Sequence, residues 1–147
     1  KTISLTYKKM PFLRIAPICN GKIYVAPRSY QGEEPGKLDI PMEDYIYACK
    51  TDTDKYAKEV ENKYSNHITG QPEPRFSLKH LVKETNGVKK TIMLYILPLN
   101  DEEQIHFTGG KFVTPEEIEM NSAQYSSFLK EEIDHLNIVT QMWEEFK

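Results

Sequence analysis

Two Asn-Gly pairs, each set between runs of apolar residues, constrain the fold more than any other feature of the sequence. They are Asn20-Gly21 and Asn86-Gly87. An Asn-Gly pair favours the tight two-residue turn of a β-hairpin, because both residues tolerate a positive φ. The first pair predicts a hairpin over Phe12–Ala26, and the second predicts a hairpin made from Arg75–Glu84 and Lys90–Leu97.

Helical periodicity follows the first hairpin, over Asp52–Tyr64, with Thr51 as the expected cap. Its apolar stripe is Tyr56, Ala57, Val60 and Tyr64. The opposite, polar face carries Lys55, Lys58, Glu59, Glu61, Asn62 and Lys63. This division predicts a helix that packs one face on a sheet and exposes the other.

Two more helices and two short strands complete the expected elements. Thr114 and Pro115 are typical of a helix start, and Tyr125–Phe146 predicts a long helix. The short strands are expected at Thr2–Tyr7 and Gln104–Phe107. The order of strands and helices predicts one α+β domain over residues 1–147, with a mixed β-sheet flanked by helices.

Composition excludes several classes of protein. With 39% hydrophobic and 11% aromatic residues the chain can bury a core, and its formal net charge of −3 argues against nucleic-acid binding. No stretch approaches the ~18 apolar residues of a membrane span. Cys19 and Cys49 are too few for a disulfide framework and predict free thiols in a reducing cytoplasm.

The ends of the sequence suggest contacts beyond this domain. The first residue is Lys1 rather than Met, so we expect a processed chain or a domain excised from a longer protein. The apolar stripe of the last helix is longer than a small domain needs, from Tyr125 to Phe146. We therefore expect a homodimer, or a contact with regions of a longer chain.

Three segments resemble the Nudix family in order and spacing. They are Arg14–Arg28 as the opening hairpin, Leu38–Pro41 as the stretch before the family signature, and Gly110–Ile118 as the late G-K-W-x-x-x-E-E-I segment. The resemblance implies an α/β/α sandwich, and for an active member a Mg²⁺-dependent pyrophosphohydrolase. It spans most of the chain.

The Nudix signature itself is eroded. Lys58–Ser65 falls where the family has R-E-U-x-E-E-x-G, so that only Glu59 matches one of the three helix glutamates. Asn62 and Lys63 replace the other two, and Met42-Glu43 replaces the glycine pair. Mg²⁺ requires a site rich in oxygen ligands, and a Lys ammonium at that place would repel it. We expect no cofactor, or Mg²⁺ if the chain is active.

Candidate site residues follow from these patterns. Glu59 is the candidate catalytic residue and metal ligand, and Glu103 could supply a late carboxylate, with a solvated turn as the alternative for Glu103. Ligand binding is predicted for Arg14 and Arg28, whose guanidinium groups match phosphate oxygens, with ion pairing as the alternative. Phe76 and Phe112 could stack on a base, with core packing as the alternative.

These observations predict a catalytically silent Nudix-like domain that binds a nucleotide-like or phosphorylated ligand or acts as a regulatory module. An active Nudix pyrophosphohydrolase with displaced carboxylates is one alternative. A protein-interaction domain that uses its terminal helix is the other.

Overall fold

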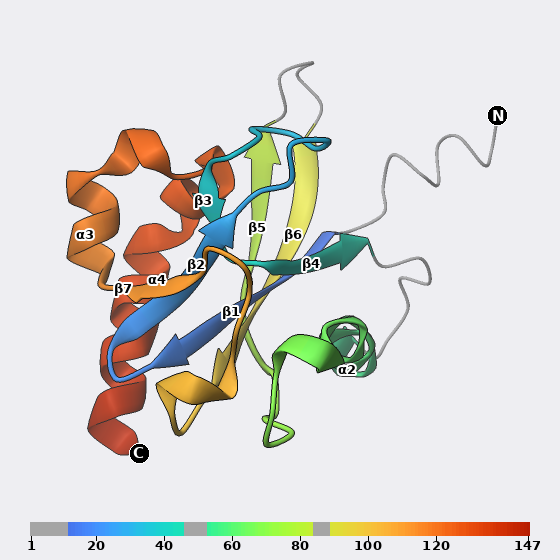
Figure 1. Cartoon of the computed structure of the whole chain (residues 1–147), viewed down its shortest axis with the longest axis vertical. Helices are drawn as coiled ribbons and strands as arrows, with labels where there is room; N and C mark the ends of the chain where they lie inside the picture. The colour runs from blue at the N-terminus through green and yellow to red at the C-terminus, as the bar shows by residue number, and fades with distance from the viewer. Residues whose placement is uncertain (1–11, 46–52, 84–88) are drawn as a thin grey trace, which may run out of the picture.

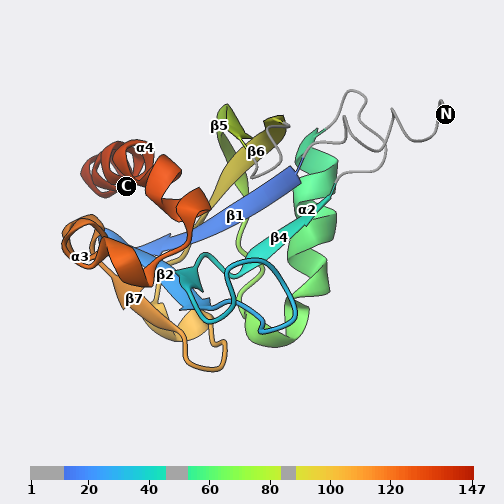
Figure 2. The same cartoon turned by 90° about the horizontal axis from the view of Figure 1, so that it is seen from above.

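The computed structural model describes residues 12–45, 53–83 and 89–147. Seven strands form one sheet, and helices lie on both of its faces (Figures 1 and 2). The strands are β1 (Phe12–Cys19), β2 (Lys22–Pro27), β3 (Leu38–Asp39), β4 (Met42–Tyr45), β5 (Arg75–Lys83), β6 (Lys89–Pro98) and β7 (Lys111–Val113). The α-helices are α2 (Thr53–Lys63), α3 (Pro115–Met120) and α4 (Ser127–Phe146), and the 3₁₀ turns are η1 (Ser65–His67), η2 (Glu102–Gln104) and η3 (Ser122–Gln124).

Strand β1 is the centre of this mixed sheet. It pairs with β2 and β4 in antiparallel fashion and with β6 in parallel, in the order β3-β2-β1-β6-β5. All eight of its residues are buried. A strand covered on both faces has a continuous apolar run rather than an alternating pattern, which explains the run at the start of the described chain.

The two faces of the sheet bury separate cores, as an α/β/α sandwich requires. Ala16 and Ile18 of β1 pack in the core beneath α3 and α4. Leu13 and Ile15 of the same strand pack in the other core, with Ala57 of α2. Figure 2 shows α2 on one side of the sheet and α3 and α4 on the other. The predicted fold class is confirmed.

Both predicted hairpins are present. Asn20 and Gly21 have φ of 53° and 75°, as a primed turn requires, and Ile18 faces Ile23 across it. Strands β5 and β6 pair from Arg75↔Ile96 to Lys83↔Lys89, with an irregularity between Phe76 and Leu78. The second Asn-Gly pair lies outside the described residues, as do the predicted strand at 2–7 and the cap at position 51.

The helix predictions agree with the structure to within two residues at the ends. Ala57 and Val60 are buried, while Tyr56 and Tyr64 are half-buried at the edges of the stripe. The Thr114 hydroxyl accepts a hydrogen bond from the Glu117 amide at 3.1 Å, and Pro115 is the first residue of α3. Helix α4 begins two residues later than predicted, because the Ser126 hydroxyl caps it.

The predicted strand Gln104–Phe107 is wrong. Its first residue ends the 3₁₀ turn η2, and Ile105 forms only an isolated bridge with Ile68. The reason is local: Asp101 accepts a hydrogen bond from the Glu103 amide, and the Gln104 side chain reaches back to the Asp101 amide. This capping box holds the turn in place of an extended ladder.

In the part of the chain that the structure describes, none of the helices combines the length and the apolar character needed to cross a membrane.

Substitution of Val60 by Ala tests how α2 is held on the sheet. The side chain is 5% exposed. We expect Val60→Ala to reduce the free energy of unfolding by about 1–3 kcal/mol, because it removes buried methyl groups and leaves a cavity. Urea denaturation followed by circular dichroism measures the change. Ile138→Val, at an exposed position of α4, is the control and should change stability by less than about 0.5 kcal/mol; equal losses would contradict this packing.

Candidate functional site

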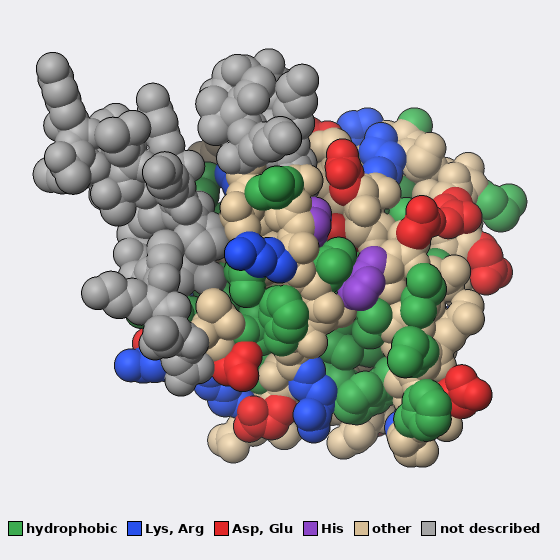
Figure 3. All heavy atoms as spheres, turned by 180° about the vertical axis from the view of Figure 1, so that it is seen from behind, with side chains coloured by type: hydrophobic (Ala, Val, Ile, Leu, Met, Phe, Trp, Pro, Cys, Tyr) green, Lys and Arg blue, Asp and Glu red, His purple; other side chains and the backbone are tan. Residues whose placement is uncertain are grey.

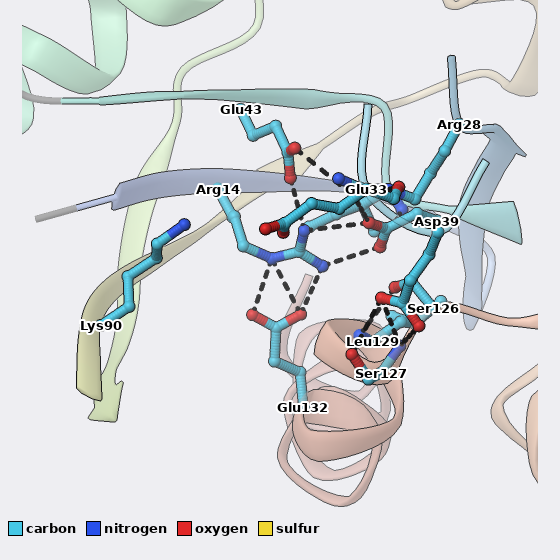
Figure 4. A network of polar contacts seen from close by, with 12 residues as sticks. Arg14, Arg28, Glu33, Asp39, Glu43, Lys90, Ser126, Ser127, Leu129 and Glu132 are labelled. Atoms are coloured by element: carbon cyan, nitrogen blue, oxygen red, sulfur yellow. Dashed lines mark hydrogen bonds and ion pairs between the residues drawn. The ribbon is translucent and has the colours of Figure 1, made fainter. Parts of the chain in front are cut away.

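A charged residue, Arg14, lies in the middle of the buried strand β1, and its side chain is 0% exposed. Its guanidinium donates to Glu132 of α4 at 2.8 and 2.9 Å, and to Asp39 of β3 at 2.8 and 3.1 Å. It also donates to Glu43 of β4 at 2.6 Å. Figure 4 shows the three carboxylates converging on the guanidinium from three different elements. A buried charge persists only when it is paired in this way.

A second arginine extends the network toward the surface. Arg28, at the end of β2, pairs with Asp39 and lies 3.4 Å from a Glu43 carboxylate oxygen. The His80 imidazole lies 3.0 Å from the Glu132 carboxylate. Two guanidinium groups thus face three carboxyl groups.

The network shifts the pKa values of Asp39 and Glu43 in opposite directions. Burial alone would raise the pKa of Asp39, but Arg14 and Arg28 together hold that pKa below its ordinary value. Burial raises the pKa of Glu43, and the nearby Asp39 adds to the effect against the attraction of the two arginines. Glu43 is therefore the carboxyl group of this pair that more readily holds a proton.

A pocket opens beside the network. Its lining includes the polar side chains of Arg28 and Glu43 and the aromatic side chains of Tyr64, His67 and Phe107. The His67 and Phe107 rings are stacked, with centroids 4.0 Å apart and planes 8° apart. The Tyr64 hydroxyl donates to the Glu43 carbonyl at 3.1 Å. The pocket thus combines an aromatic wall, made by the stacked His67–Phe107 pair, with hydrogen-bond donors and acceptors.

The polar face of α2 does not provide a magnesium site. Lys63, at a position where the Nudix signature has Glu, forms an ion pair with Asp44 of β4. Glu59 and Asn62 are exposed. Across residues 12–45, 53–83 and 89–147, no three His, Cys, Asp or Glu side chains are grouped so that they could hold a metal ion. The described residues on this face of α2 therefore do not fit Mg²⁺.

Glu59 and Glu103 belong to separate elements. Glu59 lies on α2, and Glu103 lies in η2, where Asp101 accepts a hydrogen bond from its amide. The neighbouring Glu102 contacts the first hairpin turn through Asn20. Both candidate carboxylates are exposed, so a shared metal-binding role stays a prediction without geometric support.

The four predicted ligand-binding residues do not meet in one pocket. Arg28 lines the pocket described above. Arg14 is buried and its guanidinium donors bind carboxylates, which is the ion pairing that the sequence left open, and a phosphate-binding role stays a prediction. Phe76 is 50% exposed on the edge strand β5, where its ring meets Tyr95 at 5.5 Å. Phe112 is partly buried and packs against the core beside Tyr24, its ring centroid 5.0 Å away.

The sequence interpretation missed the partners of Arg14 and the aromatic wall. An arginine inside an apolar strand indicates that buried carboxylates pair with it. The sequence alone does not show which acidic residues those partners are. Cys19 is free and buried, as expected; Cys49 lies outside the described residues.

Comparisons with known proteins agree with this architecture. Neither the models of protein families nor the curated proteins give a match. Among solved structures, a Nudix hydrolase from Nitrosomonas europaea is 11% identical, with a TM-score of 0.62 and 90% of each chain covered. A protein from Deinococcus radiodurans is 15% identical, with a TM-score of 0.63, over 88% of this chain and 83% of its own. The C-terminal domain of mouse MUTYH, solved in complex with human PCNA, is 16% identical, with a TM-score of 0.55, over 93% and 88%.

This chain therefore has the Nudix-like fold that its sequence resemblance implied. At these identities the likeness concerns the fold alone.

The opposite pKa shifts of Asp39 and Glu43 predict opposite contributions to stability. Asp39→Asn should reduce the free energy of unfolding by about 3–5 kcal/mol at neutral pH, because it removes the buried carboxylate that pairs with both Arg14 and Arg28. A lowered carboxyl pKa stabilises the fold above the ordinary value of 3.8, so this loss should shrink as the pH falls below that value.

Glu43→Gln is the matched comparison. A raised pKa means that ionisation of Glu43 opposes folding, so stability falls as the pH rises above 4.5. The Gln variant should lose less stability than Asp39→Asn, and its stability relative to the unaltered protein should improve as the pH rises. Urea denaturation from pH 3 to pH 8 measures both variants. Equal losses at neutral pH would show that the two carboxyl groups are equivalent.

Proposed function

We propose that this chain is a catalytically silent Nudix-like domain that binds a nucleotide-like ligand in the pocket beside the Arg14 network. The observation that carries the proposal is the Lys63–Asp44 ion pair on α2. It places a positive charge, and a carboxylate already paired with it, where a metal-dependent hydrolase needs several free carboxylates.

The lining of the pocket supports a ligand that carries a flat polar ring. A planar base can stack on the His67–Phe107 wall, and stacking of this kind tolerates different bases. Arg28 donates hydrogen bonds and the Glu43 carboxylate accepts them, so the edge of the ring would meet both kinds of partner.

The charge of the network sets the orientation of such a ligand. Arg28 is already paired with two carboxylates, so the polar side of the pocket does not attract a phosphate. We infer that the base lies against this side and that any phosphate group points toward solvent. A cytoplasmic location, the absence of nucleic-acid binding and a regulatory role stay predictions.

The experiment is an assay of Mg²⁺-dependent release of phosphate and nucleotide from dinucleotides, nucleotide sugars and nucleoside triphosphates. We expect negligible turnover with every substrate. Asn62→Glu combined with Lys63→Glu should strengthen Mg²⁺ binding, measured by calorimetry, because it restores carboxylates on one helix face. Robust turnover by the unaltered chain, abolished by Glu59→Gln, would establish the hydrolase alternative instead.

The same compounds serve as ligands in a thermal-shift assay without Mg²⁺. At least one is expected to raise the melting temperature, and His67→Ala should abolish the rise because it removes half of the stacked wall. His106→Ala is the matched control, since that side chain is exposed beside the wall but does not line the pocket. The absence of any rise across the compounds, or an equal effect of both variants, would contradict the ligand proposal.

The end of α4 favours a second candidate, a protein-interaction domain. Ile138, Met142 and Phe146 are 58%, 51% and 78% exposed, at successive positions four residues apart. Figure 3 shows hydrophobic side chains gathered toward the C-terminal end of this helix. Exposed apolar groups of this kind often mark contact surfaces, and one similar fold, the MUTYH domain, was solved with a partner protein.

Light scattering across a range of concentrations tests the homodimer predicted from this stripe. We expect a mass that rises toward that of a dimer, and Met142→Glu should return it to that of a monomer. Ser122→Glu, at an exposed position outside α4, is the control. A monomer at every concentration would contradict the predicted homodimer.

A further inference from the structure

The flank of α2 that faces the loop before β5 differs from the solvated surface expected from the sequence. Glu61, predicted to lie on the charged outer face, is only 6% exposed. Lys58 and Asn62 share its side of α2, and Ser65 of the following turn η1 lies beside them. Together with Gly70 and Gln71 of the following loop, they line a pocket with a volume of about 380 Å³.

One buried oxygen atom in this pocket lacks a hydrogen-bond donor in the described part of the chain. The Glu61 Oε1 atom is buried and has no hydrogen-bond donor among the described residues. The Lys58 amino group lies 3.3 Å away, which makes an ion pair, but its direction does not give a hydrogen bond. Burial raises the pKa of Glu61 against the attraction of Lys58. A buried carboxylate oxygen without a donor is costly, and each such group in a native fold calls for an explanation.

The charges around the pocket define what would satisfy this oxygen. Lys58 lies between two carboxylates, 3.3 Å from Glu61 and 3.5 Å from Glu73. These three groups together carry one net negative charge, and the Glu73 side chain is 72% exposed to solvent. Asn62 and Ser65 add neutral oxygen atoms at the rim. A single positive charge that carries N–H donors matches this arrangement, whereas Mg²⁺ requires more oxygen ligands than one buried carboxylate provides.

We propose that this pocket binds the ammonium group of a small organic amine, with Glu61 Oε1 as its principal hydrogen-bond acceptor. The amine N–H groups donate to Glu61 and to the oxygen atoms of Asn62 and Ser65. The site shares no residue with the pocket beside the Arg14 network. A test of amine binding here is therefore independent of the proposed nucleotide-like ligand.

The test is an NMR titration of the ¹⁵N-labelled chain with ethylammonium chloride at constant ionic strength. We expect saturable shifts of the backbone amides in residues 58–71. Tetramethylammonium chloride is the matched control ligand, because it has the same charge but no N–H donor, and it should give no saturable shift there. Equal shifts from the two ions, or shifts confined to other parts of the chain, would overturn the proposal.

Substitution of the acceptor completes the experiment. Glu61→Gln should weaken ethylammonium binding by about tenfold or more, because a hydrogen bond to a charged group is lost. Glu119→Gln, at an exposed position of α3, removes the same charge elsewhere and should leave the affinity within about twofold. Unchanged binding by a folded Glu61→Gln variant would also refute the site. If that variant does not fold, the comparison of ethylammonium with tetramethylammonium on the unaltered chain still tests the proposed site.

Discussion

The ion pairs of Arg14 are the interaction on which the rest of the sandwich depends. A guanidinium at the centre of a buried strand requires carboxylates within hydrogen-bond distance, and these come from β3, β4 and α4. The position of each element is therefore tied to the same few atoms. Breaking one pair would leave an uncompensated buried charge, which is far more costly than the loss of a surface ion pair.

This network also determines the character of the neighbouring pocket. Arg28 lies 3.4 Å from Glu43 and pairs with the buried Asp39, so the lining of the pocket contains both a hydrogen-bond donor and an acceptor. On the other side of β4, Asp44 is paired with Lys63 of α2. The chain thus has the helix and the strand of a Nudix-like fold, and the Lys63–Asp44 ion pair joins α2 to β4.

The sequence predicted those parts of the fold that depend on neighbours along the chain. The Asn20-Gly21 turn, the Thr114 cap and the Ala57–Val60 stripe are each set by a few consecutive residues. The incorrect strand at 104–107 also has a local cause, since the Asp101 capping box competes with extended pairing. The candidate site depends more on tertiary packing: Arg28 lines the pocket, whereas Phe112 is partly buried and packs against the core.

By itself, then, the sequence determined most of the elements and their buried faces, and it placed Asn62 and Lys63 rather than carboxylates on the polar face of α2. Only the tertiary structure decided that Arg14 pairs with Glu132, a residue 118 positions away, and that Glu61 is buried against the loop beyond α2. Turns and caps are stabilised by hydrogen bonds within a few residues, so their signals are local. A buried charge is stabilised by whichever distant partner the packing of the sheet and helices brings within about 3 Å, and sequence spacing carries no record of that distance.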